Sequence, residues 1–439
     1  MKFSKYNLLI PSTNNEQYIL FNTYKGSCFE VDNSVANIIN ETSLDALNVE
    51  TKELFELAGV IIPDEVNEQH MIAYNQNYSK YNNPYHTSTI LLTWDCNLKC
   101  TYCYQETGKN KEYLTMDRAN RYIDFMLASV KQSNAKSVSI YLFGGEPLMN
   151  IEVGYYILEK IKSYCEANNI IFSSHLITNG TLLTTEDIAR LYLLNCRTIQ
   201  ITLDGLREVH DKRKIYVNGK GSFDEIMSAL HILNERNDIR TTIRVNIDKK
   251  NIMHTRELLD YIGKNGEALT NCDVFFGVIR NLDAACFNNS TNCLLDSEIN
   301  DVLYSLWNYA EKQGFKHNMK PRRRTLHCGT YYNNTYTVTP ELDVYKCVVH
   351  AGVKEHLMGR IDEYGHLVDL TPAFYEWMTV DPFKNDSCKV CVYLPNCGGG
   401  CGVMAYNEAG TYQAKGCYQL KDTLEREVVK FARETVINR

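Results

Sequence analysis

The sequence predicts an α/β protein whose largest part is a parallel sheet covered by helices. From residue 87 onward, short runs rich in β-branched and aromatic residues, typical of strands, alternate with longer amphipathic stretches, typical of helices. Six such repeats fit into about 190 residues, a rhythm that favours parallel strands joined by helices. The sheet could be an open doubly wound one or a partial (β/α)6 barrel; in both, functional residues gather at the carboxyl ends of the strands.

The expected elements follow this alternation in order. Strands are predicted at 87–94, 137–143, 171–178, 197–203, 240–247 and 272–278, and helices between them at 115–132, 151–168 and 222–236. Ahead of this region, strand-like runs at 6–12 and 17–32 precede helical patterns at 33–41 and 50–62. The polar segment 75–86 has no periodicity and is interpreted as a linker.

These changes of pattern predict three domains, as expected for a chain of 439 residues. Residues 1–85, with strands followed by helices, predict a small winged-helix-like domain. Residues 86–310 form the α/β core. Residues 311–439 show little periodicity and contain seven cysteines, which predicts an irregular metal-binding domain.

Composition excludes several classes of function. The net charge of −7 argues against a general nucleic-acid-binding protein, which usually has a basic surface. No apolar run is long enough to cross a membrane, and the first residues lack the apolar stretch of a secretory signal. We therefore expect a cytoplasmic protein, in which 16 cysteines indicate metal binding or catalysis rather than disulfides.

Three cysteines follow the first core strand with the spacing C-x3-C-x2-C: Cys96, Cys100 and Cys103. Zinc is one alternative, but structural zinc sites are closed by four ligands, and a fourth cysteine or a histidine is missing nearby. Iron–sulfur clusters also use cysteine ligands. A [4Fe-4S] cluster held by three cysteines would leave one iron free for another ligand.

This spacing, with Tyr102 just before the third cysteine, resembles the radical S-adenosylmethionine (SAM) superfamily. The resemblance implies a partial (β/α)6 barrel in which Cys96, Cys100 and Cys103 hold the cluster. In that family the free iron binds SAM, and an electron from the cluster cleaves it to a 5′-deoxyadenosyl radical that abstracts hydrogen from the substrate. An external donor such as flavodoxin or ferredoxin supplies the electron.

Further motifs at successive strand ends fit the same family. The segment 143–149 resembles its GGE motif, and the resemblance places Glu146 at the SAM amino group, with Gly144 and Gly145 allowing close approach. Tyr102 and four residues that end later strands are expected to complete the SAM site: Asn179, Asp204, Arg213 and Asn246. Asn-Gly and Asp-Gly are also common turn dipeptides, so each residue alone is a weak signal.

The C-terminal cysteines resemble the SPASM extension of radical SAM enzymes, which carries two auxiliary [4Fe-4S] clusters. The resemblance assigns Cys388, Cys391, Cys397 and Cys417 to Auxiliary II. It assigns Cys328, Cys347 and Cys401 to Auxiliary I. Two zinc ribbons are the alternative.

Auxiliary I lacks an assigned fourth ligand, because no cysteine occurs between Cys328 and Cys347. The ligand could be Cys272, Cys286 or Cys293, a non-cysteine side chain, solvent, or a thiolate of the substrate. A substrate thiolate bound there would be deprotonated and close to the substrate radical, which offers a route to a thioether bond.

The resemblance implies an oxidoreductase that matures ribosomally made peptides, binding leader and core of a precursor peptide and forming a thioether or carbon–carbon cross-link. Residues 1–85 resemble the winged-helix modules that bind leader peptides. The first alternative is anaerobic sulfatase maturation, which yields formylglycine; those enzymes have an aspartate directly after the Auxiliary I cysteine, where this chain has Val348. A second alternative is a non-enzymatic electron-transfer or zinc-binding scaffold.

Overall fold

The computed structural model describes residues 1–12, 17–105, 111–279, 293–294, 296–316, 321–417 and 421–437. The chain divides into two compact units. The first comprises Met1–Tyr81, Asn318–Tyr331 and Glu376–Arg439; the second comprises Asn82–His317 and Tyr332–Tyr375. The N-terminal range thus shares a unit with most of the C-terminal cysteines, while the division into three domains stays a prediction.

The second unit is built on the predicted parallel sheet. Its first six strands in chain order are β6 (Tyr85–Leu91), β8 (Ser137–Phe143), β9 (Ile171–Thr178), β10 (Cys196–Thr202), β12 (Arg240–Ile247) and β13 (Asp273–Val278). Each pairs in parallel with the next, so sheet order follows chain order. A doubly wound sheet reverses its strand order, and these described strands do not. The α/β class is confirmed, and the winding is that expected of a partial (β/α)6 barrel.

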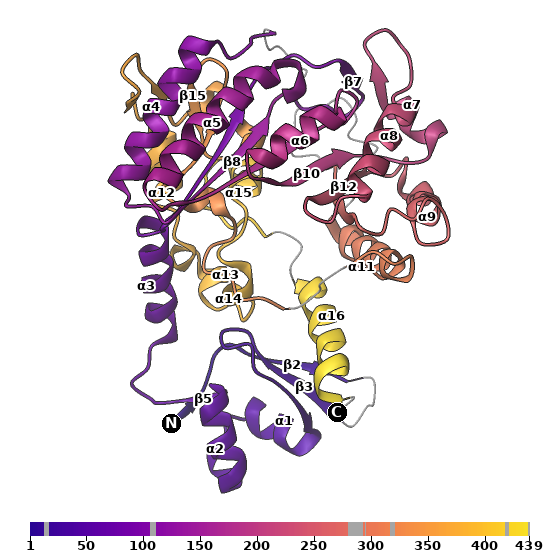
Figure 1. Ribbon diagram of the computed structural model, residues 1–439. Helices are drawn as coiled ribbons and strands as arrows, with labels where there is room; N and C mark the ends of the chain where they lie inside the picture. Colours follow the sequence, from indigo (N-terminus) through magenta and orange to yellow (C-terminus); the bar gives the residue numbers. More distant parts are fainter. Residues whose placement is uncertain are drawn as a thin grey trace. The chain divides into compact units, whose positions relative to one another are not determined.

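Amphipathic helices connect the strands and cover one face of the sheet. They are α4 (Met116–Gln132), α5 (Ile151–Ala167), α6 (Thr185–Leu193), α8 (Phe223–Asn234), α9 (Ile252–Ile262) and α11 (Asp296–Lys312). Side-chain caps begin two of them: Thr115 for α4, and a capping box of Thr184 and Asp187 for α6. Helices α4 and α5 lie side by side over the sheet (Figure 1).

Side-chain burial alternates along the strands, so the sheet has one packed face and one more open face. On β9, Phe172, Leu176 and Thr178 are buried, whereas His175 and Ile177 are only half-buried. Because successive side chains point to opposite faces, the packed positions meet the helices and the others line the opposite face. We call this opposite face the inner face of the sheet.

Four short strands extend the sheet beyond β6: β14 (Thr335–Val338), β15 (Asp343–Tyr345), β16 (Gly359–Ile361) and β17 (Leu367–Val368). Strand β14 is parallel to β6 and the remaining pairs are antiparallel. This extension was not predicted, because strands of two to four residues carry little periodicity and depend on pairing. Inside the unit, Lys346 donates to three backbone carbonyls (Tyr332, Asn333 and Thr335) and secures the start of β14.

The first unit opens with a three-stranded antiparallel sheet of β2 (Asn7–Pro11), β3 (Gln17–Asn22) and β4 (Cys28–Asp32). The run predicted at 17–32 is therefore two strands joined by a turn. Helices α1 (Asn33–Asn40) and α2 (Val49–Ala58) pack with one face of this sheet, and α16 (Lys421–Ala432) packs with the other. The paired strands β1 (Lys2–Phe3) and β5 (Ile61–Ile62) complete the module.

The segment interpreted as a linker from residue 75 is helical as far as Tyr81. It belongs to α3 (Glu68–Tyr81), whose Gln76 and Lys80 are buried. The Lys80 ammonium donates to the carbonyls of Met378 and Val380, within the same unit. The linker prediction was wrong here, because such tertiary hydrogen bonds override the low apolar content of the segment.

The C-terminal part of the first unit consists of short elements, as the lack of periodicity predicted. They include α13 (Asp386–Lys389), α14 (Leu394–Cys397) and α15 (Gly402–Ala409). Trp377, near the end of α12 (Pro372–Met378), is buried between Tyr331 and Tyr412. Among the described helices, none has the length and hydrophobicity needed to cross a membrane.

Candidate functional site

A cavity of about 380 Å³ opens at the carboxyl ends of the parallel strands in the second unit. Its lining includes eight of the residues predicted from sequence for the cluster and the SAM site: Cys96, Cys100, Tyr102, Cys103, Gly144, Gly145, Asn179 and Asn246. They come from segments far apart in the chain, and the sheet brings them together. The predicted residues Glu146, Asp204 and Arg213 lie outside the lining, where they support it.

The loop after β6 positions Cys96. The Cys96 amide donates to the Asp95 carboxylate at 3.0 Å, and Asp95 also receives a hydrogen bond from the Tyr113 hydroxyl and pairs with Lys111. Partial burial would raise the pKa of Asp95, but the contacts with Lys111 and Tyr113 hold it below its usual value. The carboxylate therefore stays charged and keeps the start of the cysteine motif in place.

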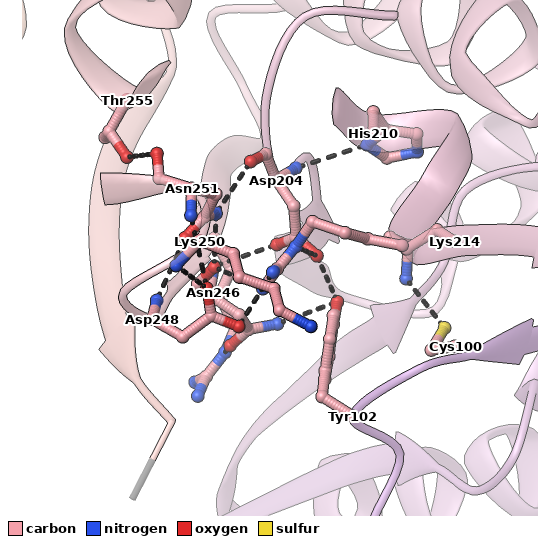
Figure 2. A network of polar contacts seen from close by, with 12 residues as sticks. Cys100, Tyr102, Asp204, His210, Lys214, Asn246, Asp248, Lys250, Asn251 and Thr255 are labelled. Carbon is pink, nitrogen blue, oxygen red and sulfur yellow. Dashed lines mark hydrogen bonds and ion pairs between the residues drawn. The ribbon is translucent and has the colours of Figure 1, made fainter. Parts of the chain in front are cut away.

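Cys100 ends β7 (Leu98–Cys100), which pairs with the antiparallel strand β11 (Lys214–Tyr216). Cys100 and Lys214 are opposite each other in this register. The Lys214 ammonium is buried and lies 3.6 Å from the Cys100 sulfur (Figure 2). Burial alone would lower the pKa of Lys214, but Cys100 and Asp204 raise it above its usual value. The site thus holds a permanent cation that the sequence analysis missed.

The two glycines after β8 allow the cysteine loop to pass close by. A side chain at Gly145 would place its Cβ 2.2 Å from the carbonyl oxygen of Asp95, far inside contact distance. The amides of Gly145 and Glu146 instead donate to the carbonyls of Thr93 and Asp95. The glycine pair therefore joins the cysteine loop to the end of β8 and leaves backbone exposed to the cavity.

The Glu146 carboxylate is fully buried and connects two strand ends. It accepts hydrogen bonds from the Thr178 hydroxyl and the Asn179 amide, both at 2.7 Å, and from the Leu148 amide at 3.0 Å. Burial raises its pKa, and these donors oppose that effect. Each carboxylate oxygen already accepts from protein donors, so the structure assigns Glu146 a supporting place, and contact with the SAM amino group stays a prediction.

Tyr102, Asp204 and Arg213 form a buried network behind the cysteines. The Tyr102 hydroxyl donates to Asp204, and the Arg213 guanidinium is 3.6 Å from the same carboxylate and 2.8 Å from Asp248. The guanidinium also lies over the Tyr102 ring, 5.0 Å from its centroid. Burial, together with Asp204, raises the pKa of Tyr102 well above its usual value, so the hydroxyl remains a donor.

Two further polar residues that were not predicted from sequence contact Asp204 directly (Figure 2). Asn251 donates to the carbonyls of Asp204 and Asn246, and its own amide is bonded to Asp248. His210, in α7 (Arg207–Arg213), accepts from the Asp204 amide at 3.2 Å. Burial lowers the pKa of His210 to about 3, so the imidazole is neutral and can accept.

The cavity residues fit a [4Fe-4S] cluster with a bound cofactor. Burial, with smaller contributions from Glu146 and Cys100, raises the pKa of the Cys96 thiol to about 12, and a bound metal would be needed to keep it a thiolate. The Lys214 cation balances the negative charge that such thiolates would bring, and the exposed glycine backbone gives a ligand room to approach. We therefore expect Cys96, Cys100 and Cys103 to hold the cluster.

Replacing Lys214 by glutamine is expected to make the cluster harder to reduce. Reduction adds negative charge beside the buried ammonium, so loss of the cation should lower the reduction potential by about 60 mV, equivalent to about 1.4 kcal/mol for one electron. Potentiometric titration followed by EPR measures this shift. Lys214→Arg, which keeps the charge, is the control, and an equal potential in both variants would exclude the electrostatic role.

The four cysteines predicted for Auxiliary II all belong to the first unit. Burial raises the pKa of Cys397 to about 11, with further increases from Cys417, Cys388 and Cys391, so their sulfurs are within electrostatic reach of one another. Among the described residues, no three His, Cys, Asp or Glu side chains are close enough to share one metal ion. That these cysteines hold a cluster stays a prediction.

The predicted Auxiliary I ligands are divided between the units. In the first unit, Cys328 and Cys401 interact electrostatically, and the Cys401 amide donates to the Gly416 carbonyl. Cys347 belongs to the second unit. Of the fourth ligands considered from sequence, Cys272 and Cys293 are buried, and Cys286 lies outside the described residues.

Replacing Cys397 by alanine is expected to remove about four of about twelve irons per chain. The reason is that Cys397 would be one of four ligands to a single cluster, and the SAM-binding cysteines would be unaffected. Iron and sulfide analysis after anaerobic reconstitution measures the loss, with 5′-deoxyadenosine formation as the second readout. Retention of all the iron would contradict the ligand assignment.

Comparison with known proteins agrees with this geometry. Residues 90–262 match the family model described as the radical SAM superfamily. The matched range begins in β6, includes the three cysteines and the glycine pair, and ends with α9. It therefore covers the part of the chain that lines the cavity.

Two curated relatives and one solved structure extend the comparison. The chain is 31% identical over 173 residues to a cysteine-type anaerobic sulfatase-maturating enzyme of Clostridium novyi, spanning 39% of this chain and 46% of that enzyme. It is 23% identical to the radical SAM cyclopropyl synthase TigE of Paramaledivibacter caminithermalis, over 97% of this chain and 95% of TigE.

The crystal structure of Streptococcus suis SuiB bound to its precursor peptide SuiA has a TM-score of 0.55 at 15% identity, covering 95% of this chain and 99% of SuiB. This likeness shows a shared fold. The matched family model, not this likeness, identifies residues 90–262 of this chain as a radical SAM domain.

Proposed function

We propose that the chain is a radical SAM oxidoreductase that matures a ribosomally made precursor peptide by forming an intramolecular cross-link. The observation that carries this proposal is the single cavity that collects three cysteines, the glycine pair and Asn246 at the strand ends. The similarity to TigE extends along nearly the whole chain, and the shared fold with SuiB, which was solved with a bound precursor peptide, supports a peptide as the substrate.

Several residues of the chain have distinct roles at this site. Cys96, Cys100 and Cys103 would hold the cluster, which with SAM supplies a 5′-deoxyadenosyl radical. Lys214 places a positive charge beside Cys100, and Glu146 fixes the strand ends around the cysteine loop. These contacts position the cysteine loop and the strand ends that would hold the cluster and SAM.

The proposed cross-link removes two hydrogen atoms from the peptide. One leaves as a hydrogen atom from a carbon, and the other leaves its partner as a proton and an electron, so an electron acceptor is needed. The seven C-terminal cysteines would hold two auxiliary clusters suited to that role. A flavodoxin or ferredoxin would be the external donor, and so many cysteine ligands suit a reducing compartment such as the cytoplasm.

The sheet β2–β3–β4 in the first unit is proposed to bind the leader of the precursor peptide. Its order leaves β2 and β4 as edges among the described strands, and an extended peptide can add to such an edge as a further strand. Tethering the leader would raise the effective concentration of the core peptide at the cavity.

The experiment uses the anaerobically reconstituted full-length chain with SAM, a reductant and the small peptide encoded beside its gene. The expected product is lighter by two hydrogen atoms in mass spectrometry, and Cys100→Ala gives none. The leaderless core should need at least about tenfold higher concentration for the same rate. Unmodified peptide in the presence of SAM cleavage would count against a cross-link to this substrate.

Formylglycine formation is the second candidate, because of the similarity to the sulfatase-maturating enzyme. The position after Cys347 is Val348, and the nearby acids have other partners: Glu341 accepts from the Trp94 indole and Asp343 pairs with Arg360. A sulfatase-motif peptide in the same assay separates the candidates. Its conversion to formylglycine would favour the second.

A further inference from the structure

Arg244 stands on the inner face of the sheet, next to the cavity. On β12, Arg244 and Asn246 are two residues apart and therefore share a face, and Asn246 lines the cavity. The residue paired with Arg244 on β10 is Thr202, which also lines the cavity. Arg244 thus shares the inner face with two residues that line the cavity, and it is not one of the residues predicted from sequence.

Three contacts fix the orientation of this guanidinium. Its Nε donates to the Asn246 side-chain oxygen at 2.8 Å. Its Cζ lies 5.5 Å from the centroid of the Phe275 ring, on the neighbouring strand β13. A side chain at Gly277 would put its Cβ 2.5 Å from Nη2, so the glycine makes the space that the guanidinium occupies. The hydrogen bond to Asn246 and the Phe275 ring therefore orient the guanidinium.

The two terminal nitrogens of Arg244 have no partner among the residues that the structure describes. Among the described residues, neither Nη atom donates a hydrogen bond to an acceptor, and no carboxylate lies within 4.0 Å of the guanidinium. The neighbouring arginines differ: Arg213 pairs with Asp204 and Asp248, and Arg240, on the same strand, pairs with Asp273. An arginine is always charged, and a partly buried charge without a counter-charge is costly.

We propose that Arg244 binds a carboxylate of the substrate, an aspartate or glutamate side chain of the core peptide. A guanidinium held through Nε presents its two terminal nitrogens to the two oxygens of a carboxylate, which gives a bidentate pair. The inference rests on the proposed function, since it assumes that a peptide enters the cavity. Phe275, 48% exposed beside it, offers an apolar surface to the adjoining peptide residue.

The cavity wall connects this subsite to the cysteine motif. Asn246, which accepts from Arg244, donates in turn to the Tyr102 hydroxyl at 3.2 Å, and that hydroxyl donates to Asp204. A carboxylate bound to Arg244 would therefore be connected to the network that contains Tyr102, the residue between Cys100 and Cys103 in the cysteine motif. The hydrogen bonds through Asn246 thus link the proposed subsite to Tyr102 of the cysteine motif.

SAM also carries a carboxylate, so the test distinguishes binding of a peptide carboxylate from binding of the SAM carboxylate. The reconstituted full-length protein, with SAM bound, is titrated with N-acetyl-glutamate amide and with its neutral counterpart N-acetyl-glutamine amide, and binding is followed by ligand-detected NMR. The variants are Arg244→Gln, Arg244→Lys, and Arg240→Gln as a matched control on the same strand. Iron content and thermal midpoint establish that each variant is folded.

The proposal predicts at least a tenfold preference of the wild-type protein and of Arg240→Gln for the glutamate probe. Arg244→Gln should lose the preference, and Arg244→Lys should retain part of it. Equal binding of both probes to the wild type, or an unchanged preference in Arg244→Gln, overturns the proposal. A loss of SAM affinity in Arg244→Gln overturns it too, because the carboxylate would then be that of SAM.

The same samples report separately on the proposed function. Formation of 5′-deoxyadenosine by the wild-type protein needs the cysteine site but no acidic probe. Absence of this product would contradict the proposed function while leaving the probe preference measurable. Conversely, SAM cleavage without a probe preference would contradict only the carboxylate subsite.

Discussion

Cys100→Ala is expected to remove about four of about twelve irons per chain and to reduce 5′-deoxyadenosine formation to background. Cys100 is one of three cysteines that line the cavity, and its sulfur is the one that Lys214 contacts at 3.6 Å. Two remaining thiolates would leave two irons without a protein ligand. Iron analysis, EPR and chromatography of the SAM products measure the effect.

Cys165→Ala serves as the matched control for this substitution. Cys165 is a fully buried residue of α5 in the hydrophobic core, with no assigned ligand role. Its replacement should cost some stability and leave the iron content unchanged. Full iron content and SAM cleavage in Cys100→Ala would refute the assignment of the cavity cysteines.

Asp204→Ala should destabilise the folded protein by about 3–5 kcal/mol, the usual cost of removing one partner from a buried ion pair. Asp204 has a fully buried side chain that receives the Tyr102 hydroxyl and the Asn246 amide and faces Arg213. At about 2–4 °C per kcal/mol, its loss corresponds to a fall in thermal midpoint of about 10 °C. Circular dichroism of the reconstituted protein measures it.

Asp224→Ala is the control for the cost of losing an aspartate from an ion pair. Asp224 pairs with Arg207 through side chains that are both more than half exposed. Such a solvent-screened surface pair contributes little to stability, so the thermal midpoint should hardly move. Equal shifts in the two variants would mean that the Asp204 network contributes no more than a surface pair.

The core fold was predictable because each of its strands carries its own signal. Strands such as β8 and β12 are long, bounded by turn residues and separated by amphipathic helices, so pattern alone gives their number and order. The same logic places Gly145, Asn179 and Asn246 at strand ends, where the cavity lies. The site residues that lie at strand ends could therefore be predicted from the sequence.

Residues whose role depends on pairing between distant segments were not predictable. Lys214 is one of several charged residues in a row, a pattern typical of an exposed face, and only the pairing of β11 with β7 brings it to Cys100. Arg244 alternates with apolar residues, as any residue on the inner face does, so its sequence context carries no special signal. The space for its guanidinium depends on Gly277, which lies on another strand. Likewise, α3 is held by Lys80, whose partners are about 300 residues away.

Transfer of a labelled hydrogen from peptide to cofactor tests the central claim most directly. The wild-type chain is incubated with SAM, a reductant and the neighbouring precursor peptide uniformly deuterated at carbon, and the 5′-deoxyadenosine is examined by mass spectrometry. The account predicts deuterium in that product together with a cross-linked peptide. Unlabelled 5′-deoxyadenosine beside an intact peptide would contradict it.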